Sequence, residues 1–424
     1  MRMSRCQAVC AVLVLCTAIA IIAPAQTFDE LYTFTNPAYG AIAWGGVITD
    51  SAGNLYGTTV YGGDLNCVSS AYNPGCGTVY QVDASGNEKV LYSFTGLANG
   101  DGAGPEASLV RDSEGNLYGT TFAGGGGSCG LLGGCGIVFK IDPTGTETIL
   151  HVFTGGSDGA NPSASLILDS HKNLYGTTYY GGDLSCLSPY PGCGVVFKLE
   201  PNGKEVVLHT FTGPYTGGSD GSNPRGPVIR DVTGNLYGTT VRGGNGYGGE
   251  GTVFEITPSG NETVLHSFNP IFAVDGGVPI GGLVRDSAGN LYGTTSAFGT
   301  ATCACGTIFK IDPSGNESLL YSFTGAPDGR APYSGLVRDA KGNLYGTTNE
   351  GGSSSCNTPI GCGVIFKLDT NGKETVLYRF TGGLDGAFPF AGLTPAGSKA
   401  YGTASCDNEC LLYDTWGTVY SIGP

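Results

Sequence analysis

The heptapeptide GNLYGTT, residues Gly53–Thr59, recurs without change from Gly115, Gly234, Gly289 and Gly342. Two near copies, KNLYGTT from Lys172 and KAYGTA from Lys399, bring the number of copies to seven. Aligned on their Asn or its equivalent, neighbouring copies lie about 57 residues apart, a repeat length that suits one propeller blade. The repeat therefore decides the fold class before any other feature.

Each repeat contains four short segments with strand character. In the fifth repeat they are GGLVRD from Gly281, NLYGTT from Asn290, GTIFKID from Gly306 and ESLLYSF from Glu317. Asp, Ser and Gly stand between the first two and the last two segments, where tight hairpins require them. No long segment has apolar residues at helical spacing. We therefore predict an all-β protein, in which residues 26–424 form a single seven-bladed β-propeller with four strands per blade.

The two ends of the repeat array complement each other. FDELYTF from Phe28 matches a fourth strand, whereas GTVYSIG from Gly417 matches a third strand with no fourth strand after it. We predict that the N-terminal strand completes the last blade and closes the ring, which leaves no long unpaired edge. One Phe in each fourth strand is predicted to form the core between blades: Phe34, Phe94, Phe153, Phe211, Phe268, Phe323 and Phe380.

These repeats resemble the GloVer (Gloeobacter/Verruco) tandem repeat of exported bacterial proteins, which is written around GNLYGTT and GTVFKI. The resemblance covers nearly all of the chain after residue 25. It implies a propeller-like fold and an exported protein, and it implies no particular activity.

The N-terminus has the features of a secretory signal. Arg2 and Arg5 precede an apolar run over residues 8–22, and Ala23-Pro24-Ala25 offers a small-residue cleavage site. We predict cleavage near Ala25 and a secreted protein, extracellular or periplasmic. No second apolar segment is long enough to span a bilayer.

The net charge of −15 limits the partners. Such a surface repels nucleic acid and anionic lipid, so neither is an expected partner. Neutral glycans, cations and cell-surface proteins remain, and we expect a monomer that binds a glycan or a cell-surface protein.

Twelve cysteines follow the signal, in couples between the second and third strands of a blade. An exported protein permits disulfides, whereas zinc would require couples from different blades to converge. The fourth repeat lacks both cysteines and has Glu250 in their place. The predicted pairs are Cys67–Cys76, Cys129–Cys135, Cys186–Cys193, Cys356–Cys362 and Cys406–Cys410, with Cys303–Cys305 left open because one residue separates its members.

A second motif, Asp-Gly-x-x-Pro, precedes the first strand of every blade except the first. Two interpretations stay open: each Asp bonds its own turn, or the carboxylates form a ligand site that holds calcium. No cofactor is required by either interpretation. The six aspartates are Asp101, Asp158, Asp220, Asp275, Asp328 and Asp385.

Departures from the repeat are the better guides to function, because the architecture does not need them. Arginine and aromatic residues are favoured at binding sites. The candidate ligand-binding residues on the loop face are Tyr39, Trp44, Arg225, Arg242, Glu250 and Arg330.

No catalytic residue is assigned from the sequence. Three of the four histidines, His151, His209 and His266, replace tyrosines of other repeats, so a histidine base at the channel mouth lacks a candidate. We predict an exported, non-catalytic binding or interaction module for glycan or cell-envelope ligands. The alternatives are a carboxylate-dependent polysaccharide lyase or hydrolase and a structural envelope protein.

Overall fold

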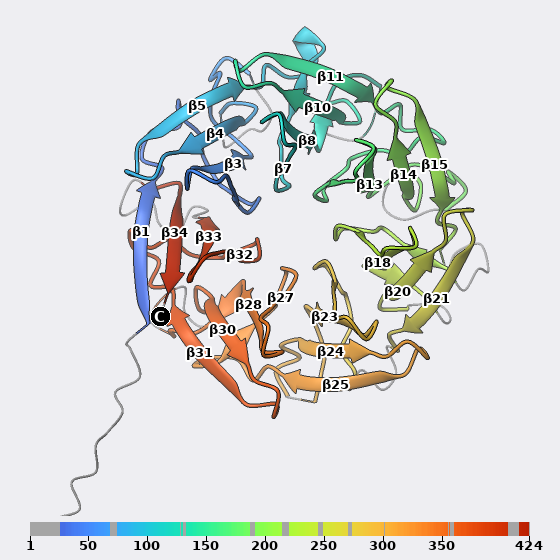
Figure 1. Ribbon diagram of the computed structural model, residues 1–424, viewed down its shortest axis with the longest axis vertical. Coiled ribbons are helices and arrows are strands. Elements are labelled where there is room, and N and C mark those ends of the chain that lie inside the picture. Colours follow the sequence, from blue (N-terminus) through green and yellow to red (C-terminus); the bar gives the residue numbers. More distant parts are fainter. Residues whose placement is uncertain are drawn as a thin grey trace, which may run out of the picture.

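The protein is a ring of seven antiparallel four-stranded sheets around a central channel, seen in a computed structural model (Figure 1). The structure describes residues 26–423 except 68–73, 128, 130–132, 187–190, 214–219, 245–248, 270–273, 301, 355, 357–359 and 406–414. The predicted signal, residues 1–25, lies outside the described residues. The prediction of an all-β, seven-bladed propeller is confirmed.

In each blade the first strand lies nearest the channel and the fourth lies outermost. Blade one has β2 (Ile48–Thr49), β3 (Leu55–Thr59), β4 (Thr78–Val82) and β5 (Glu88–Ser93). Blade two has β7 (Val110–Arg111), β8 (Leu117–Thr121), β10 (Ile137–Ile141) and β11 (Glu147–Val152). Blade three has β12 (Ile167–Leu168), β13 (Leu174–Thr178), β14 (Val195–Leu199) and β15 (Glu205–Thr210).

The remaining blades repeat this order. Blade four has β17 (Ile229–Arg230), β18 (Leu236–Thr240), β20 (Thr252–Ile256) and β21 (Glu262–Ser267). Blade five has β22 (Val284–Arg285), β23 (Leu291–Thr295), β24 (Thr307–Ile311) and β25 (Glu317–Ser322). Blade six has β27 (Val337–Arg338), β28 (Leu344–Thr348), β30 (Val364–Leu368) and β31 (Glu374–Arg379). Blade seven has β32 (Thr394–Ala396), β33 (Lys399–Ser405), β34 (Gly417–Gly423) and β1 (Thr27–Thr33).

The loops between the main strands contain short secondary-structure elements. Three two-stranded ribbons pair β6 (Gly102–Ala103) with β9 (Ala123–Gly124), β16 (Gly221–Ser222) with β19 (Arg242–Gly243), and β26 (Gly329–Arg330) with β29 (Glu350–Gly351). Within the described residues, one 3-10 turn is present, at Leu97–Asn99.

The ring closes as the chain ends predict. Strand β1 pairs antiparallel with β34, with Thr27 opposite Gly423 and Thr33 opposite Thr418. Figure 1 shows β1 on the outer side of β34, although the two strands come from opposite ends of the chain. This pairing confirms that the N-terminal strand supplies the fourth strand of blade seven.

The seven fourth-strand Phe residues form the core between blades, as predicted. All are at most 1% exposed. Each ring meets an aromatic ring in the third strand of the next blade, edge to face, with centroids 5.0 to 5.4 Å apart; Phe380 and Tyr420, for example, join blades six and seven. Edge-to-face contact is a favourable arrangement of aromatic rings, so the same contact stabilises every blade boundary.

The residues of GNLYGTT each have a local role, illustrated by blade one. Asp50 accepts hydrogen bonds from the backbone and side-chain amides of Asn54 and from the hydroxyl of Tyr56, which fixes the hairpin between β2 and β3. A Cβ on Gly57 would lie 2.4 Å from the Tyr80 hydroxyl oxygen, so the strand must have glycine here for the aromatic ring to pack against it.

The first Thr of the motif links neighbouring blades. Its hydroxyl donates to a backbone carbonyl in the channel loop of the next blade, as Thr58 does to Ala107 and Thr239 does to Gly281. Thr120, Thr294, Thr347 and Thr403 make the same bond. The hydroxyl of Thr177 is buried without a partner in the described part of the chain. The repeated motif therefore holds the loops that line the channel.

Candidate functional site

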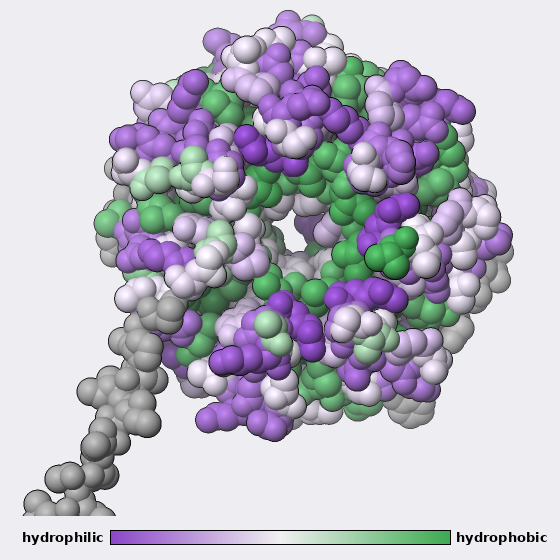
Figure 2. Space-filling view, in the orientation of Figure 1, coloured by the Kyte–Doolittle hydropathy of each residue, from purple (hydrophilic) through white to green (hydrophobic). Residues whose placement is uncertain are grey.

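A cavity of about 320 Å³ occupies the channel at the centre of the ring. Figure 2 shows the opening, with apolar side chains along much of its rim. The cavity wall is built from all seven blades, by the segments that lead into each first strand. Concave sites of this size are typical of small-ligand binding.

One residue per blade gives the cavity its chemistry. In blades two to seven it directly follows the Pro of Asp-Gly-x-x-Pro, and in blade one it stands at the equivalent place before Gly-Gly. The surrounding positions are mostly Gly, Ala or Ser, whereas this position differs in every blade. We call the set the channel ring: Trp44, Glu106, Ser163, Arg225, Ile280, Tyr333 and Phe390.

Three neighbouring residues of the channel ring are aromatic. The rings of Trp44 and Phe390 lie 5.3 Å apart, and those of Phe390 and Tyr333 lie 5.7 Å apart with their planes inclined by 30°. Because these residues come from blades one, seven and six, they form one continuous apolar wall. Sugar rings and other flat apolar faces can pack on such a wall.

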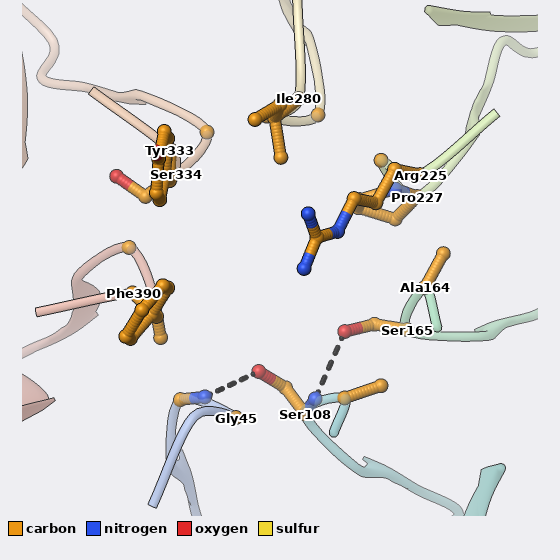
Figure 3. A pocket seen from close by; sticks show the side chains of 18 of the residues that line it. Gly45, Ser108, Ala164, Ser165, Arg225, Pro227, Ile280, Tyr333, Ser334 and Phe390 are labelled. Atoms are coloured by element: carbon orange, nitrogen blue, oxygen red, sulfur yellow. Dashed lines mark hydrogen bonds between the residues drawn. The ribbon is translucent and has the colours of Figure 1, made fainter. Parts of the chain in front are cut away.

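The opposite half carries the charges. Figure 3 shows the Arg225 guanidinium group pointing into the middle of the cavity, toward the wall that holds Tyr333 and Phe390. Arg225 makes no ion pair within 4.0 Å with another described residue. Burial raises the pKa of the Glu106 carboxyl from 4.5 to about 7, although Arg225 acts in the opposite direction. The cavity thus presents one cation and one carboxyl group that titrates near neutral pH.

Tyr333 is also electrostatically coupled to this site. Burial raises the pKa of its hydroxyl, and Glu350 raises it further against the opposing effects of Arg225 and Arg330. The hydroxyl therefore keeps its proton at neutral pH and can donate it.

Small polar groups line the narrow part of the cavity. The Ser108 hydroxyl accepts a hydrogen bond from the Gly46 amide at 2.8 Å, and the Ser165 hydroxyl accepts one from the Ser108 amide at 3.1 Å (Figure 3). Two buried polar atoms of the lining, Trp44 Nε1 and Ser163 Oγ, have no hydrogen-bond partner among the described residues.

The structure places two of the six predicted binding candidates, Trp44 and Arg225, in the cavity wall. Arg330 forms an ion pair of 3.1 Å with Glu350, next to the cavity. The other three lie in the loops around it. Arg242 pairs with Ser222 in the antiparallel ribbon of β16 and β19, and Glu250 forms an isolated parallel β-bridge with Gly243. The Tyr39 side chain is half exposed.

The sequence interpretation missed Glu106, Tyr333 and Phe390. A signal was present, because a position that is different in every copy follows a Pro that is the same in six. Comparing the repeats column by column for variation, rather than for agreement, would have found it.

The six loop aspartates lie away from the cavity wall. Their carboxylates bond their own turns: Asp101, for instance, accepts from the amides of Thr95 and Gly102 at 2.7 and 2.6 Å. The equivalent Thr amide bonds Asp158, Asp220, Asp328 and Asp385. Each of the six also approaches a Tyr or His of the outermost strand, as Asp275 approaches His266. A turn role accounts for these bonds, and calcium at the loops stays a prediction.

Four of the predicted disulfides are present: Cys67–Cys76, Cys129–Cys135, Cys186–Cys193 and Cys356–Cys362. Cys303 and Cys305, the couple left open from the sequence, are also joined. The predicted Cys406–Cys410 pair lies outside the described residues. Disulfides of this number indicate an oxidising, extracellular environment. Over the described ranges, no helix has the length and apolar character needed to cross a bilayer.

Comparison of the whole chain with known families identifies its class. The Gloeobacter/Verrucomicrobia repeat matches residues 18–188 and 185–420. The chain therefore belongs to the Gloeobacter/Verrucomicrobia repeat family, which confirms the resemblance seen in the repeats. No curated protein sequence matches the chain.

Several solved structures are similar in fold. A gluconolactonase from Xanthomonas campestris is 12% identical, with a TM-score of 0.41 over 73% of this chain and 82% of its own. A luciferin-regenerating enzyme is 12% identical, with a TM-score of 0.42 over 94% and 96%. A puromycin hydrolase is 13% identical, with a TM-score of 0.49 over 89% of this chain and 53% of its own.

These comparisons correct one prediction. The sequence interpretation favoured a non-catalytic binding module, whereas the similar structures named above are those of enzymes. The prediction rested on the lack of a histidine base at the channel mouth and did not include Glu106. This carboxyl group, whose pKa burial raises to about 7, lies inside the channel.

Proposed function

We propose that this protein is an exported carbohydrate-cleaving enzyme of the carboxylate-dependent class, with its active centre at the channel ring. The observation that carries the proposal is Glu106, whose pKa of about 7 suits proton transfer at neutral pH, in one cavity with Arg225. The N-terminal signal over residues 1–25 and the disulfides support export, which would bring the protein to extracellular or periplasmic glycans.

The lining favours elimination over hydrolysis. Glycoside hydrolysis generally uses two carboxyl groups on either side of the scissile bond. Glu106 is the single carboxyl group among the described residues that line the cavity. A lyase requires one base, one group that neutralises the substrate carboxylate and one proton donor, and the channel ring contains one residue of each kind.

The substrate class follows from Arg225. The Arg225 guanidinium group points into the cavity and has no ion-pair partner among the described residues. Such a group is suited to a carboxylate, because it can donate two parallel hydrogen bonds. The aromatic wall of Trp44, Phe390 and Tyr333 supports the ring that carries this carboxylate. A glycan that contains a uronate residue combines both features.

The chemical step can be written for these residues. Arg225 binds the uronate carboxylate and withdraws charge from it, which acidifies the adjacent C5–H bond. The Glu106 carboxylate removes that proton, the C5–H electron pair forms the C4–C5 double bond, and the C4–O bond breaks. The departing oxygen receives the proton of the Tyr333 hydroxyl. Solvent then returns Glu106 and Tyr333 to their starting states.

The test is to incubate the purified protein with a panel of uronate-containing and neutral oligosaccharides and to weigh the products by mass spectrometry. Elimination gives an unsaturated fragment with no added water, and hydrolysis adds one water. We expect unsaturated products from uronate substrates alone. Replacing Glu106 by Gln should lower kcat by about 10²-fold to 10⁴-fold, the range expected for loss of a general base. Glu114→Gln, which alters an exposed hairpin carboxylate, is the matched control.

Two outcomes would refute the proposal. One is the absence of any product from the whole panel. The other is product formation that Glu106→Gln leaves unchanged. Products with added water would mean that the enzyme is a hydrolase, in which Glu106 acts as the acid or the base.

A further inference from the structure

A cluster of side chains at the outer rim, remote from the channel ring, has the composition of a metal site. His209 lies on β15 of blade three, Asp220 lies in the loop that leads to blade four, and Glu262 lies on β21 of blade four. One ligand atom from each of the three lies within 4.8 Å of the other two. Among the described residues, no other group of three metal-binding side chains is as close.

Two observations describe the contacts inside the cluster. The Nε2 atom of His209 lies 3.1 Å from Oδ2 of Asp220, and both side chains are less than 20% exposed. The Oε1 atom of Glu262 is buried and has no hydrogen-bond partner among the described residues, as is also true of the equivalent oxygens of Glu88, Glu147, Glu205, Glu317 and Glu374. A buried carboxylate oxygen without a partner is costly, and a cation is one way to satisfy it.

The charges also fit a cation. Two carboxylates and one imidazole are ligands that zinc accepts, with bonds of about 2.0 to 2.2 Å. In a tetrahedral site such bonds place ligand atoms about 3.4 Å apart, so small side-chain movements within the present cluster are sufficient.

The equivalent positions of the other blades supply an internal comparison. At this place Tyr92, Tyr321 and Tyr378 stand where blade three has His209, and a neutral tyrosine is a poor metal ligand. His151 and His266 have the same kind of neighbours, but their Nε2 atoms lie 3.6 and 3.3 Å from the Asp carboxylate and their groups are not as tightly clustered.

We propose that His209, Asp220 and Glu262 bind one divalent transition-metal ion, zinc in the first instance, and that this ion ties blade three to blade four. A water molecule completes the tetrahedron. On binding, the metal replaces the proton between His209 and Asp220 and satisfies the free oxygen of Glu262. Blade four has no cysteine couple, so the ion would cross-link the repeat that lacks a disulfide.

The experiment is equilibrium dialysis of the purified protein against ZnSO4, followed by metal analysis and by Tm measurements with and without zinc. We expect about one zinc ion per chain and a higher Tm in its presence. His209→Tyr places in blade three the residue that other blades already have, so the fold should be kept. It should reduce zinc affinity at least about 10-fold and abolish the Tm shift.

His266→Tyr is the matched control, because it makes the same replacement at the looser cluster of the next blade boundary. It should bind zinc as the unaltered protein does. Glu262→Gln should weaken binding as His209→Tyr does. The proposal is overturned if the unaltered protein retains no zinc, if His209→Tyr retains it fully, or if His266→Tyr loses it equally.

Discussion

Thr403 in blade seven donates a hydrogen bond of 3.0 Å to the carbonyl oxygen of Gly45, the residue after Trp44 in blade one. The bond joins the two ends of the ring at the cavity wall. Because the same bond recurs at five other blade boundaries, the repeat motif positions the loops that line the channel as well as the blades. The consequences of this arrangement can be measured.

Replacing Thr239 by Val should destabilise the protein. The Gly281 carbonyl would lose its donor inside the core, which costs about 1 to 3 kcal/mol of the free energy of unfolding. Thr177→Val removes a hydroxyl that has no partner among the described residues, so its effect should stay within about 0.5 kcal/mol. Urea denaturation of both variants measures the difference. Equal effects in the two variants would show that the hydroxyl bond does not matter.

Much of this fold could be predicted because its determinants are local and repeated. The turn made by Asp50 and Asn54 lies within five residues of chain, and the strand pattern recurs in every copy. The closure by β1 could also be predicted, because a fourth-strand pattern stands alone at one end and is missing at the other. Each strand or turn pattern is weak evidence by itself, but its recurrence in seven copies identifies the propeller.

The proposed active centre could not be predicted in the same way. Glu106, Arg225 and Tyr333 are far apart in sequence and meet only because seven loops converge on one axis. The residue at this position of the repeat is different in every copy. An alignment that searches for shared residues therefore passes over it. The shifted pKa of Glu106 arises from burial in a cavity that exists only after the ring has closed.

Replacing Gly238 by Ala should also destabilise the protein, for a steric reason. A Cβ at Gly238 would lie 2.5 Å from the Phe254 ring, which is itself fully buried and cannot move aside. Overpacking of this kind costs about 1 to 3 kcal/mol. Gly126→Ala is the control, because its Cβ would come no closer than 3.5 Å to Val152. A small effect at Gly238, measured by the same denaturation, would mean that the strand can shift away from the ring.

Stability should fall as the pH rises from about 4.5 to about 7. Burial raises the pKa of Glu205 from 4.5 to about 7, and Asp158 adds to the shift. In this window the folded protein holds a proton that the unfolded chain has released, so raising the pH favours unfolding. Equivalent carboxyl groups with a pKa of about 7 are Glu88, Glu147, Glu262 and Glu374.

The measurement is the free energy of unfolding at several pH values across this window. Glu205→Gln cannot titrate and should make the dependence less steep, while the four equivalent groups still contribute to it. Below the window the trend reverses, because the hairpin aspartates such as Asp50 have a lowered pKa and lose their stabilising charge as they are protonated. A flat profile from pH 4.5 to 7 would contradict the raised values.

Arg225 should control affinity for charged substrates. Arg225→Gln removes the cation, and losing hydrogen bonds to a charged group costs about 1.5 to 3 kcal/mol, which is roughly a 10-fold to 100-fold rise in KM for uronate oligosaccharides. Ser163→Ala, at the neighbouring place in the channel ring, should change KM much less. A neutral oligosaccharide affected as strongly as a uronate would argue against a role for the charge.

The channel ring has a consequence for how this architecture can diversify. Seven side chains that face one cavity stand on loops whose packing is supplied by other, repeated residues. Each channel-ring residue can be substituted without altering the contacts at a blade boundary. A rearrangement of whole repeats would change the order of these residues around the channel. In a scaffold of this kind, ligand specificity can change by substitution of one channel-ring residue at a time, while the propeller itself stays the same.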